Sequence, residues 1–182
     1  MLNWQIDSSW SLFLDRDGVI NERIMGGYVT KIEDFHFLPG VEIAISKFTT
    51  LFSSIFVVTN QQGIAKKIMT ESNLLEIHSY MTDELLKMNG KITKCYYAPG
   101  FKNEENSIRK PYPAMGLMAK KEFPLIDLNK SIMVGDTDSD IKFGKNLGMK
   151  TIRIRTEEPI NFDADYTCDS LLELANIFEN EK

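Results

Sequence analysis

The sequence predicts an α/β fold built on a doubly wound parallel sheet. Short apolar runs alternate along the chain with amphipathic helical patterns, which is the element order of a parallel sheet with helices on both faces. The first run, at 11–14, is apolar after its serine and too short for an amphipathic helix, as expected for a strand buried on both faces. Ligands of such sheets bind beyond the carboxyl ends of the strands. The residues that follow each run are therefore the candidates for a functional site.

Strand and helix patterns alternate over most of the chain. Apolar runs predict strands at 10–14, 54–58, 94–98, 131–134 and 150–154. Apolar residues three and four positions apart predict helices at 41–52, from Thr70 to Asn89-Gly90, at 114–123, and through Ile141, Phe143 and Leu147 up to Gly148. A short strand at 165–168 and a helix at 171–178 form a C-terminal addition at about 160–182, which we expect at the sheet edge.

One loop-rich segment, at 21–39, interrupts this alternation. Its Gly26-Gly27 pair and its apolar residues Ile32, Phe35 and Phe37 predict a small β-flap that overhangs the end of the sheet. We expect no large inserted cap. Residues 1–182 are expected to form a single domain, for which this length and a hydrophobic share of 43% suffice.

Charge and cysteine content argue against several classes of protein. The net charge of −5 argues against broad binding to nucleic acid or to an anionic membrane, and it favours a small-molecule partner. Cys95 and Cys168 lie far apart in the sequence, so neither a disulfide framework nor a zinc site is indicated. The sequence contains no run of about 18 apolar residues and no signal-peptide pattern, so a cytoplasmic location is the default expectation. We separately expect a monomer.

The segment Asp15-Arg16-Asp17-Gly18, directly after the first apolar run, is the most informative feature. Two carboxylates about 4 Å apart repel each other by roughly 4 kcal/mol at an effective dielectric of about 20, so a fold that gathers them needs a cation. Side chains at i and i+2 of an extended segment point the same way. Asp15 and Asp17 should therefore project together while Arg16 turns aside, and Gly18 should leave room for a ligand. The expected ligands of Mg²⁺ are oxygens of Asp15, Asp136 and the backbone carbonyl of Asp17.

Three distant residues follow other predicted strands and should meet this segment. We expect Asp15 to be a nucleophile that forms an aspartyl-phosphate, and Asp17 to be the general acid and base. The hydroxyl of Thr59 and the ammonium of Lys110 should hold the transferred phosphoryl group. For Asp136 the alternative role is an N-cap of the following helix. For Asp140 we favour a structural role, interacting with the helix dipole or orienting Lys110, over metal binding.

Four segments resemble the motifs of the haloacid dehalogenase (HAD) phosphatase superfamily: 12–21 (LFLDRDGVIN), 57–61 (VVTNQ), Arg109-Lys110-Pro111 and Val134-Gly135-Asp136. Further segments are similar to the D-glycero-D-manno-heptose 1,7-bisphosphate phosphatases: 27–29 (GYV), 35–41 (FHFLPGV), 61–65 (QQGIA) and 109–113 (RKPYP). The resemblance spans about 10–156. It implies removal of the C7 phosphate during assembly of ADP- or GDP-activated heptose for surface polysaccharide such as lipopolysaccharide.

The resemblance also implies Mg²⁺ as the cofactor and a set of substrate contacts. These contacts are Gly26, Gly27, Tyr28, Asn60, Gln61, Gln62, Arg109 and Thr137. Many relatives hold a structural zinc ion in the loop before the Arg-Lys-Pro motif, but the matching positions here are Ala98, Gly100, Asn106 and Ile108. These residues do not make a zinc ligand set, so no structural zinc is expected.

Other functions share some of these features and stay open as alternatives. A histidinol-phosphate phosphatase has the same motifs, although the Gly-Tyr-Val segment and the lack of a fused dehydratase domain favour the heptose substrate or another phosphorylated sugar. A polynucleotide 3′-phosphatase fits poorly with an acidic chain. A receiver-like module that only accepts phosphate on an aspartate is the alternative outside enzymes. Asp17 distinguishes a phosphatase from such a module, because a built-in general acid and base predicts that the aspartyl-phosphate is hydrolysed and the protein turns over.

Overall fold

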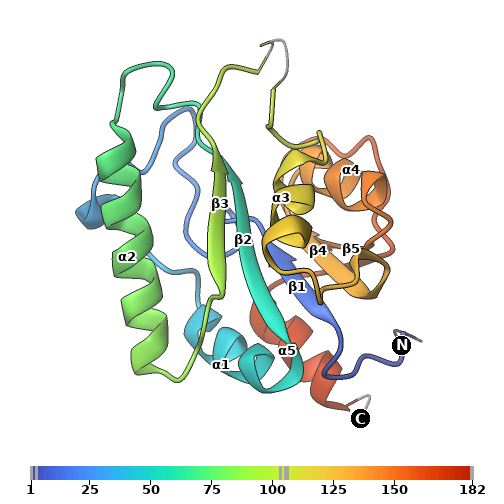
Figure 1. Cartoon of the computed structure of the whole chain (residues 1–182). Helices are drawn as coiled ribbons and strands as arrows, with labels where there is room; N and C mark the ends of the chain where they lie inside the picture. The colour runs from blue at the N-terminus through green and yellow to red at the C-terminus, as the bar shows by residue number, and fades with distance from the viewer. Residues whose placement is uncertain (1, 3, 103, 105–106, 181–182) are drawn as a thin grey trace.

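The computed structural model describes residues 2, 4–102, 104 and 107–180. Across these residues, six parallel strands form one sheet in the order β3-β2-β1-β4-β5-β6 (Figure 1). The strands are β1 (Ser11–Leu14), β2 (Ser54–Asn60), β3 (Lys94–Ala98), β4 (Ser131–Gly135), β5 (Lys150–Ile154) and β6 (Tyr166–Cys168). The predicted parallel α/β sheet is confirmed, and the short C-terminal strand adds to its edge as expected.

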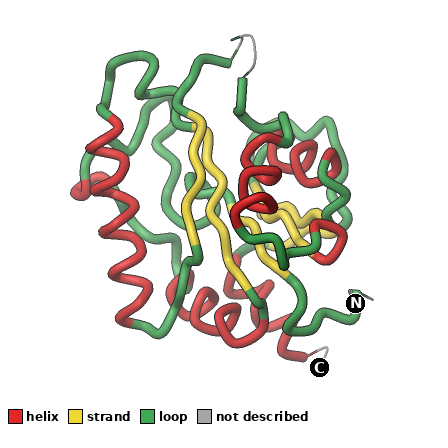
Figure 2. Tube along the Cα trace, viewed as in Figure 1, coloured by secondary structure: helices red, strands yellow, loops and turns green. Residues whose placement is uncertain are grey.

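Helices cover both faces of the sheet (Figure 2). Their bounds are α1 (Val41–Leu51), α2 (Glu71–Lys87), α3 (Ala114–Glu122), α4 (Asp138–Asn146) and α5 (Leu171–Asn180). Neighbouring residues of β1 point to opposite faces: Leu12 and Leu14 belong to the core under α1, α2 and α5, whereas Phe13 packs with Met115 of α3 and Phe143 of α4. Within the described ranges, no helix is long and apolar enough to cross a membrane.

The strand register brings the predicted site residues to one end of the sheet. Leu14 lies beside Val57 of β2 and Val134 of β4. The backbone N–H of Asp15 donates to the carbonyl of Val134 at 2.9 Å, so Asp15 and the residues after β4 emerge together. β2 continues beyond the predicted end of its strand, and Thr59 lies inside it, because β3 pairs with it as far as Asn60.

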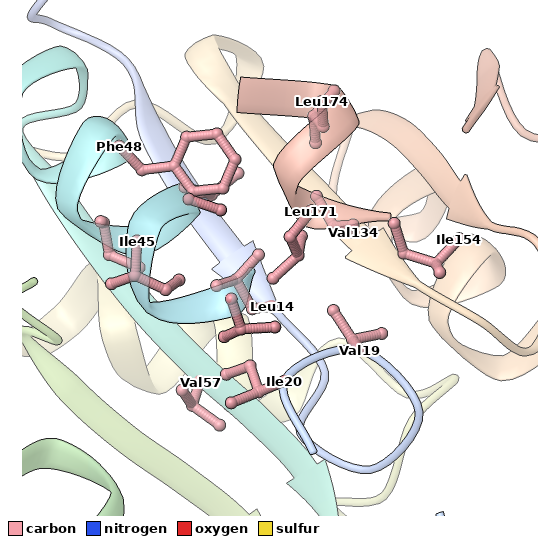
Figure 3. Close-up of a cluster of buried hydrophobic side chains, with 14 of the residues drawn as sticks. Leu14, Val19, Ile20, Ile45, Phe48, Val57, Val134, Ile154, Leu171 and Leu174 are labelled. Carbon is pink, nitrogen blue, oxygen red and sulfur yellow. The ribbon is translucent and has the colours of Figure 1, made fainter. Parts of the chain in front are cut away.

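The loop after β1 is anchored in the hydrophobic core. Val19 and Ile20 are buried, and they belong to a cluster with side chains from α1, α5 and the four strands β1, β2, β4 and β5 (Figure 3). The other labelled members are Leu14, Ile45, Phe48, Val57, Val134, Ile154, Leu171 and Leu174. Burial of an aliphatic side chain of this size stabilises the folded state by about 1.5–3 kcal/mol. The two anchors therefore hold the short segment that carries Asp15 and Asp17.

Segment 21–39 differs from its prediction. Over these described residues the structure has one antiparallel bridge, between Asn21 and Phe37, and a 3-10 helix, η1 (Ile32–Asp34), in place of longer strands in the predicted β-flap. Ile32 and Phe35 lie three residues apart, a spacing that suits a 3-10 turn, whereas one face of a strand needs a spacing of two. Phe35 is buried and contacts the ring of Tyr80 in α2, which ties this loop to the core.

Candidate functional site

The carboxyl end of the sheet holds a pocket of about 310 Å³. All four predicted catalytic side chains line it, together with most of the predicted substrate contacts. The lining residues are Asp15, Asp17, Arg23, Ile24, Gly26, Gly27, Tyr28, Val29, Thr59, Asn60, Arg109, Lys110, Thr137 and Ser139. The pocket therefore combines the ends of β1 and β2, the loop after β1, the segment before α3 and the first turn of α4.

Lys110 joins two carboxylates at the bottom of the pocket. Its Nζ lies 2.7 Å from Asp15 Oδ1 and 2.6 Å from Asp140 Oδ1, and it donates to the carbonyl of Val58 at 2.6 Å. Burial raises the pKa of Asp15 to about 6, although the nearby ammonium opposes this shift. Burial also disfavours a charged lysine, but the two carboxylates outweigh it and raise the pKa of Lys110. Asp15 is therefore held as a carboxylate near neutral pH.

Asp136 faces the backbone of the loop after β1. Gly18 has a φ of +92°, and a Cβ at this position would lie 2.3 Å from Asp136 Oδ2. The sequence suggested that Gly18 leaves room for a ligand, and the structure shows that the Asp136 carboxylate takes part of that room. Burial, with the charges of Asp15 and Asp140, raises the pKa of Asp136 to about 8. Such a carboxylate gains much from a bound cation.

Asp136 is not the N-cap of α4, which was the alternative role considered for it. Thr137 holds the N-cap position of α4. The Asp140 carboxylate accepts from the backbone N–H of Thr137 at 3.0 Å and from its hydroxyl at 2.6 Å. Asp140 thus orders the first turn of the helix while it also pairs with Lys110, which matches the structural role expected for it.

Asp17 is held by a different cation. Arg16 donates to Asp17 Oδ1 at 2.9 Å and to Oδ2 at 3.0 Å, and Asn21 Nδ2 donates to Oδ1 at 3.0 Å. Burial alone would raise the pKa of Asp17, but Arg16 and the amides around the carboxylate hold it below its usual range. An extended segment predicts that the side chain of Arg16 turns away from Asp17, but in the structure it contacts the Asp17 carboxylate. The chain turns after β1, so the fully buried guanidinium folds back onto its neighbour.

Asn60 and Gln61, which directly follow Thr59, hold other pocket residues in place. The side-chain amide of Gln61 donates to Asp17 Oδ2 at 2.9 Å and to the hydroxyl of Thr59 at 2.8 Å, and it is buried. It was predicted to contact substrate, but its observed partners are two other site residues. Asn60 lines the pocket and also brackets the backbone of Lys110, accepting from its N–H at 3.0 Å and donating to its carbonyl at 3.2 Å.

The outer part of the pocket is formed by Gly26, Gly27, Tyr28 and Arg109. Gly26 and Gly27 are exposed, and Arg109 is half-buried. Arg109 donates from Nη1 to the carbonyl of Gly100 at 3.3 Å, and partial burial lowers its pKa. Among the described residues, this carbonyl is the one hydrogen-bond acceptor of its guanidinium. In the part of the chain that the structure describes, Gln62 is not among the pocket-lining residues, so its predicted substrate contact has no geometric support.

Several oxygens at the pocket bottom fit a divalent cation. Carboxylate oxygens of Asp15, Asp136 and Asp140 lie within 4.8 Å of one another. The backbone carbonyl of Asp17 faces the same place, because one nitrogen of Arg23 lies 3.4 Å from it and 3.0 Å from Asp136 Oδ1. A donor set made only of oxygen suits Mg²⁺. The four zinc-loop positions include Asn106, which lies outside the described residues.

Arg23, Ile24, Val29 and Ser139 line the pocket without having been predicted as site residues. Arg23 is the most consequential of them, because it pairs with Asp136 across 113 positions of sequence. Its only sequence signal is a basic residue in the loop after an acidic motif. That signal does not say where a long side chain ends.

Comparisons with known proteins identify close relatives. A family model described as HAD-hydrolase-like matches residues 107–174. The D-glycero-α-D-manno-heptose-1,7-bisphosphate 7-phosphatase of Campylobacter jejuni is 39% identical over 171 residues, which cover 94% of this chain and 96% of that protein. The D-glycero-β-D-manno-heptose-1,7-bisphosphate 7-phosphatase of Haemophilus influenzae is 35% identical, over 94% of this chain and 98% of that protein.

The fold also matches a solved structure. The crystal structure of the D,D-heptose 1,7-bisphosphate phosphatase from B. bronchiseptica, complexed with magnesium and phosphate, superposes with a TM-score of 0.85 at 24% identity. The match covers 95% of this chain and 99% of that one. This similarity supports the fold assignment over nearly the whole length of both proteins.

Proposed function

Because this chain belongs to the D-glycero-D-manno-heptose 1,7-bisphosphate 7-phosphatase family of HAD-like hydrolases, we propose that it removes the C7 phosphate of that bisphosphate. The observation that carries the proposal is 39% identity across 94% of the chain to an enzyme of that name. The product is a heptose 1-phosphate, the form that a nucleotidyl transfer then activates to an ADP- or GDP-heptose.

The proposed nucleophile is Asp15. A carboxylate oxygen of Asp15 attacks the phosphorus, and the bond between phosphorus and the sugar oxygen breaks, leaving an aspartyl-phosphate. Two observations support this role. Asp15 lines the pocket, and its contact with Lys110 at 2.7 Å favours the ionised form that attack requires. The Lys110 ammonium and the Thr59 hydroxyl are proposed to hold the transferred phosphoryl group as fixed donors.

The proposed acid and base is Asp17. It protonates the departing sugar oxygen and then takes a proton from the water that hydrolyses the aspartyl-phosphate. The pairing with Arg16 favours the carboxylate of Asp17, which is the form needed in the second step. The first step needs the acid form. A substrate phosphate beside Asp17 supplies negative charge that raises its pKa, so protonation is expected to accompany substrate binding.

Mg²⁺ is the proposed cofactor, held by Asp15, Asp136 and the backbone carbonyl of Asp17. When bound, the ion neutralises negative charge on the phosphoryl oxygens and on the carboxylates. The outer residues Gly26, Gly27, Tyr28 and Arg109 are proposed to bind the rest of the sugar. Arg109 is suited to the second phosphate, because a guanidinium offers forked donors to a phosphate group.

Phosphate release from both anomers of the bisphosphate, with Mg²⁺, tests the proposal. Histidinol phosphate serves as the competing substrate, since its phosphatases share the motifs. A preference for one heptose anomer of more than about 10²-fold in kcat/KM corresponds to roughly 2.7 kcal/mol of differential transition-state binding and would identify both the substrate and the anomer. Equal, low kcat/KM values for all three substrates would contradict the heptose assignment.

A further inference from the structure

Arg23 lies where a metal ion is expected. Its Nη2 is 3.0 Å from Asp136 Oδ1 and 3.4 Å from the backbone carbonyl of Asp17. These are two of the three groups that the proposed function assigns to Mg²⁺. A single guanidinium nitrogen therefore lies within reach of two cation ligands. Its other terminal nitrogen, Nη1, lies 3.7 Å from Glu158 on the outer side of the site.

The charges around Arg23 explain this position. Asp15, Asp136 and Asp140 are three buried carboxylates whose oxygens lie within 4.8 Å of one another, and Lys110 contacts only two of them directly. Among the described residues, Asp136 has Arg23 as its one ion-pair partner. Burial disfavours a charged guanidinium, but Asp136 and Asp15 outweigh it and raise the pKa of Arg23.

The side chain of Arg23 is also able to leave. It keeps 27% of its surface exposed and lines the open pocket, whereas Lys110 is 1% exposed and has carboxylate or carbonyl partners on several sides. Arg23 stands in the loop after β1, with an exposed glutamate and an exposed isoleucine as its chain neighbours. A cation that arrives from the pocket can thus displace it without disturbing the core.

We propose that Arg23 is a built-in counter-cation of the metal site, which bridges Asp136 and the Asp17 carbonyl in the metal-free protein and must be displaced before a divalent cation binds. The inference rests on the proposed function, because it takes the magnesium site from there. Its consequence is measurable. Binding that requires a prior displacement is weakened by the fraction of molecules in which the site is open.

Isothermal titration calorimetry with Mg²⁺, in the absence of substrate, tests the competition. Arg23→Gln should bind Mg²⁺ at least about fivefold more tightly than the wild type, as expected if Arg23 closes the site in about 80% of molecules or more. Arg109→Gln is the charge-matched control. It removes a cation from the same pocket, but the guanidinium of Arg109 donates to the carbonyl of Gly100 and not to the carboxylates. It should shift the dissociation constant by less than about twofold.

Thermal unfolding gives a second readout that also checks folding. Metal-free Arg23→Gln should melt below the wild type, because Asp136 has lost its counter-charge, and Mg²⁺ should raise its Tm by more than it raises that of the wild type. Equal Mg²⁺ affinity in Arg23→Gln and the wild type, or equal tightening in Arg109→Gln, would overturn the inference.

Asp136→Asn separates this inference from the proposed function. Loss of Mg²⁺ binding in Asp136→Asn, with no gain in Arg23→Gln, would keep the metal site and reject the role of Arg23. Absence of Mg²⁺ binding in the wild type and in Arg23→Gln alike would reject both.

Discussion

The bottom and the rim of the pocket are built by different means. The bottom comprises Asp15, Asp17, Thr59, Lys110 and Asp136, at the ends of β1, β2 and β4 and in the segment before α3. Most of these residues are buried, and their charged groups have partners at about 3 Å or less. The rim comprises Gly26, Gly27, Tyr28 and Arg109 on loops. The two glycines are exposed and the other two residues are half-buried, and the guanidinium of Arg109 donates at 3.3 Å to one carbonyl.

This contrast predicts how each part responds to change. A group held by several short contacts cannot move to replace a lost neighbour, so substitutions at the bottom should mainly lower kcat. A rim group that is free to adapt contributes binding that is similar in the ground and transition states, so substitutions there should mainly raise KM. Four measurements can break or sharpen this contrast.

The largest effect is expected for Asp15→Asn. An amide is a poor nucleophile, so kcat for phosphate release should fall by about 10⁴-fold or more. The measurement is steady-state phosphate release with Mg²⁺ at saturating substrate. Asp83→Asn, an exposed aspartate on α2, is the matched control and should keep wild-type kcat. If Asp15→Asn kept a kcat within tenfold of that of the wild type, Asp15 would not be the nucleophile.

Asp17→Asn should have the next largest effect. Loss of a general acid and base slows proton transfer, so kcat should fall by about 10²–10⁴-fold. Because the second step also needs the base, part of the protein should accumulate as aspartyl-phosphate during turnover. Intact-mass analysis of acid-quenched protein measures that fraction. A fall in kcat of less than tenfold, with no trapped phosphoprotein, would show that Asp17 serves only to position Arg16.

His78 connects the bottom of the pocket to protein stability. It is buried on α2, and a nitrogen of Arg16 lies 3.3 Å from its Nε2. Burial, followed by the charge of Arg16, lowers the pKa of His78 to about 3, whereas an unfolded histidine titrates near 6.5. Between these values the unfolded chain binds a proton that the folded chain does not. Stability should therefore fall as the pH drops below about 6.5, by about 2 kcal/mol at about pH 5.

Urea unfolding at about pH 7.5 and about pH 5 measures this contribution in His78→Gln. The variant lacks the titrating group, so its loss of stability over this range should be about 2 kcal/mol smaller than that of the wild type. His36→Gln, at an exposed position in segment 21–39, is the matched histidine control. If His78→Gln lost as much stability as the wild type and the control, the buried pairing with Arg16 would not be a source of acid sensitivity.

The smallest effect is expected at the rim. Arg109→Gln should raise KM for the bisphosphate about tenfold, with kcat changed less than about threefold, because it removes the contact that we propose for the second phosphate, away from the reacting atoms. The increase should vanish with a sugar that carries only the phosphate to be removed. Lys102→Gln, in the same loop, is the matched control. A large fall in kcat with both substrates would mean that bottom and rim are not separable.

The bottom of the pocket was largely predictable from the sequence, for a physical reason. Asp15, Thr59, Lys110 and Asp136 follow or end apolar runs, and a parallel sheet brings the carboxyl ends of its strands together. The orientation of Arg16 was not predictable, because the assumption of an extended chain fails where the backbone turns at Gly18, which has a φ of +92°. The environment of Gln61 depends on the same turn, since Gln61 donates to Asp17.

The rim and segment 21–39 depend on contacts that sequence spacing does not encode. Phe35 is held against the core by its contact with the ring of Tyr80, which belongs to another element. Arg23 reaches Asp136 because of the path of a loop with little regular structure. A long side chain on such a loop can end at many places, and only the folded molecule selects one of them.

The two hydrogen bonds between the side chain of Asn60 and the backbone of Lys110 have a consequence for how this fold varies. Asn60 satisfies both backbone groups of Lys110, much as a neighbouring strand would. The position of Lys110 is thus fixed by Asn60 at the end of β2, rather than by the loop that connects it to β3. Insertions, deletions and changes of composition between 99 and 108 can therefore accumulate in descendants of this gene with little displacement of the ammonium group. The loop is free to diverge in sequence while the lysine stays in register with the strand.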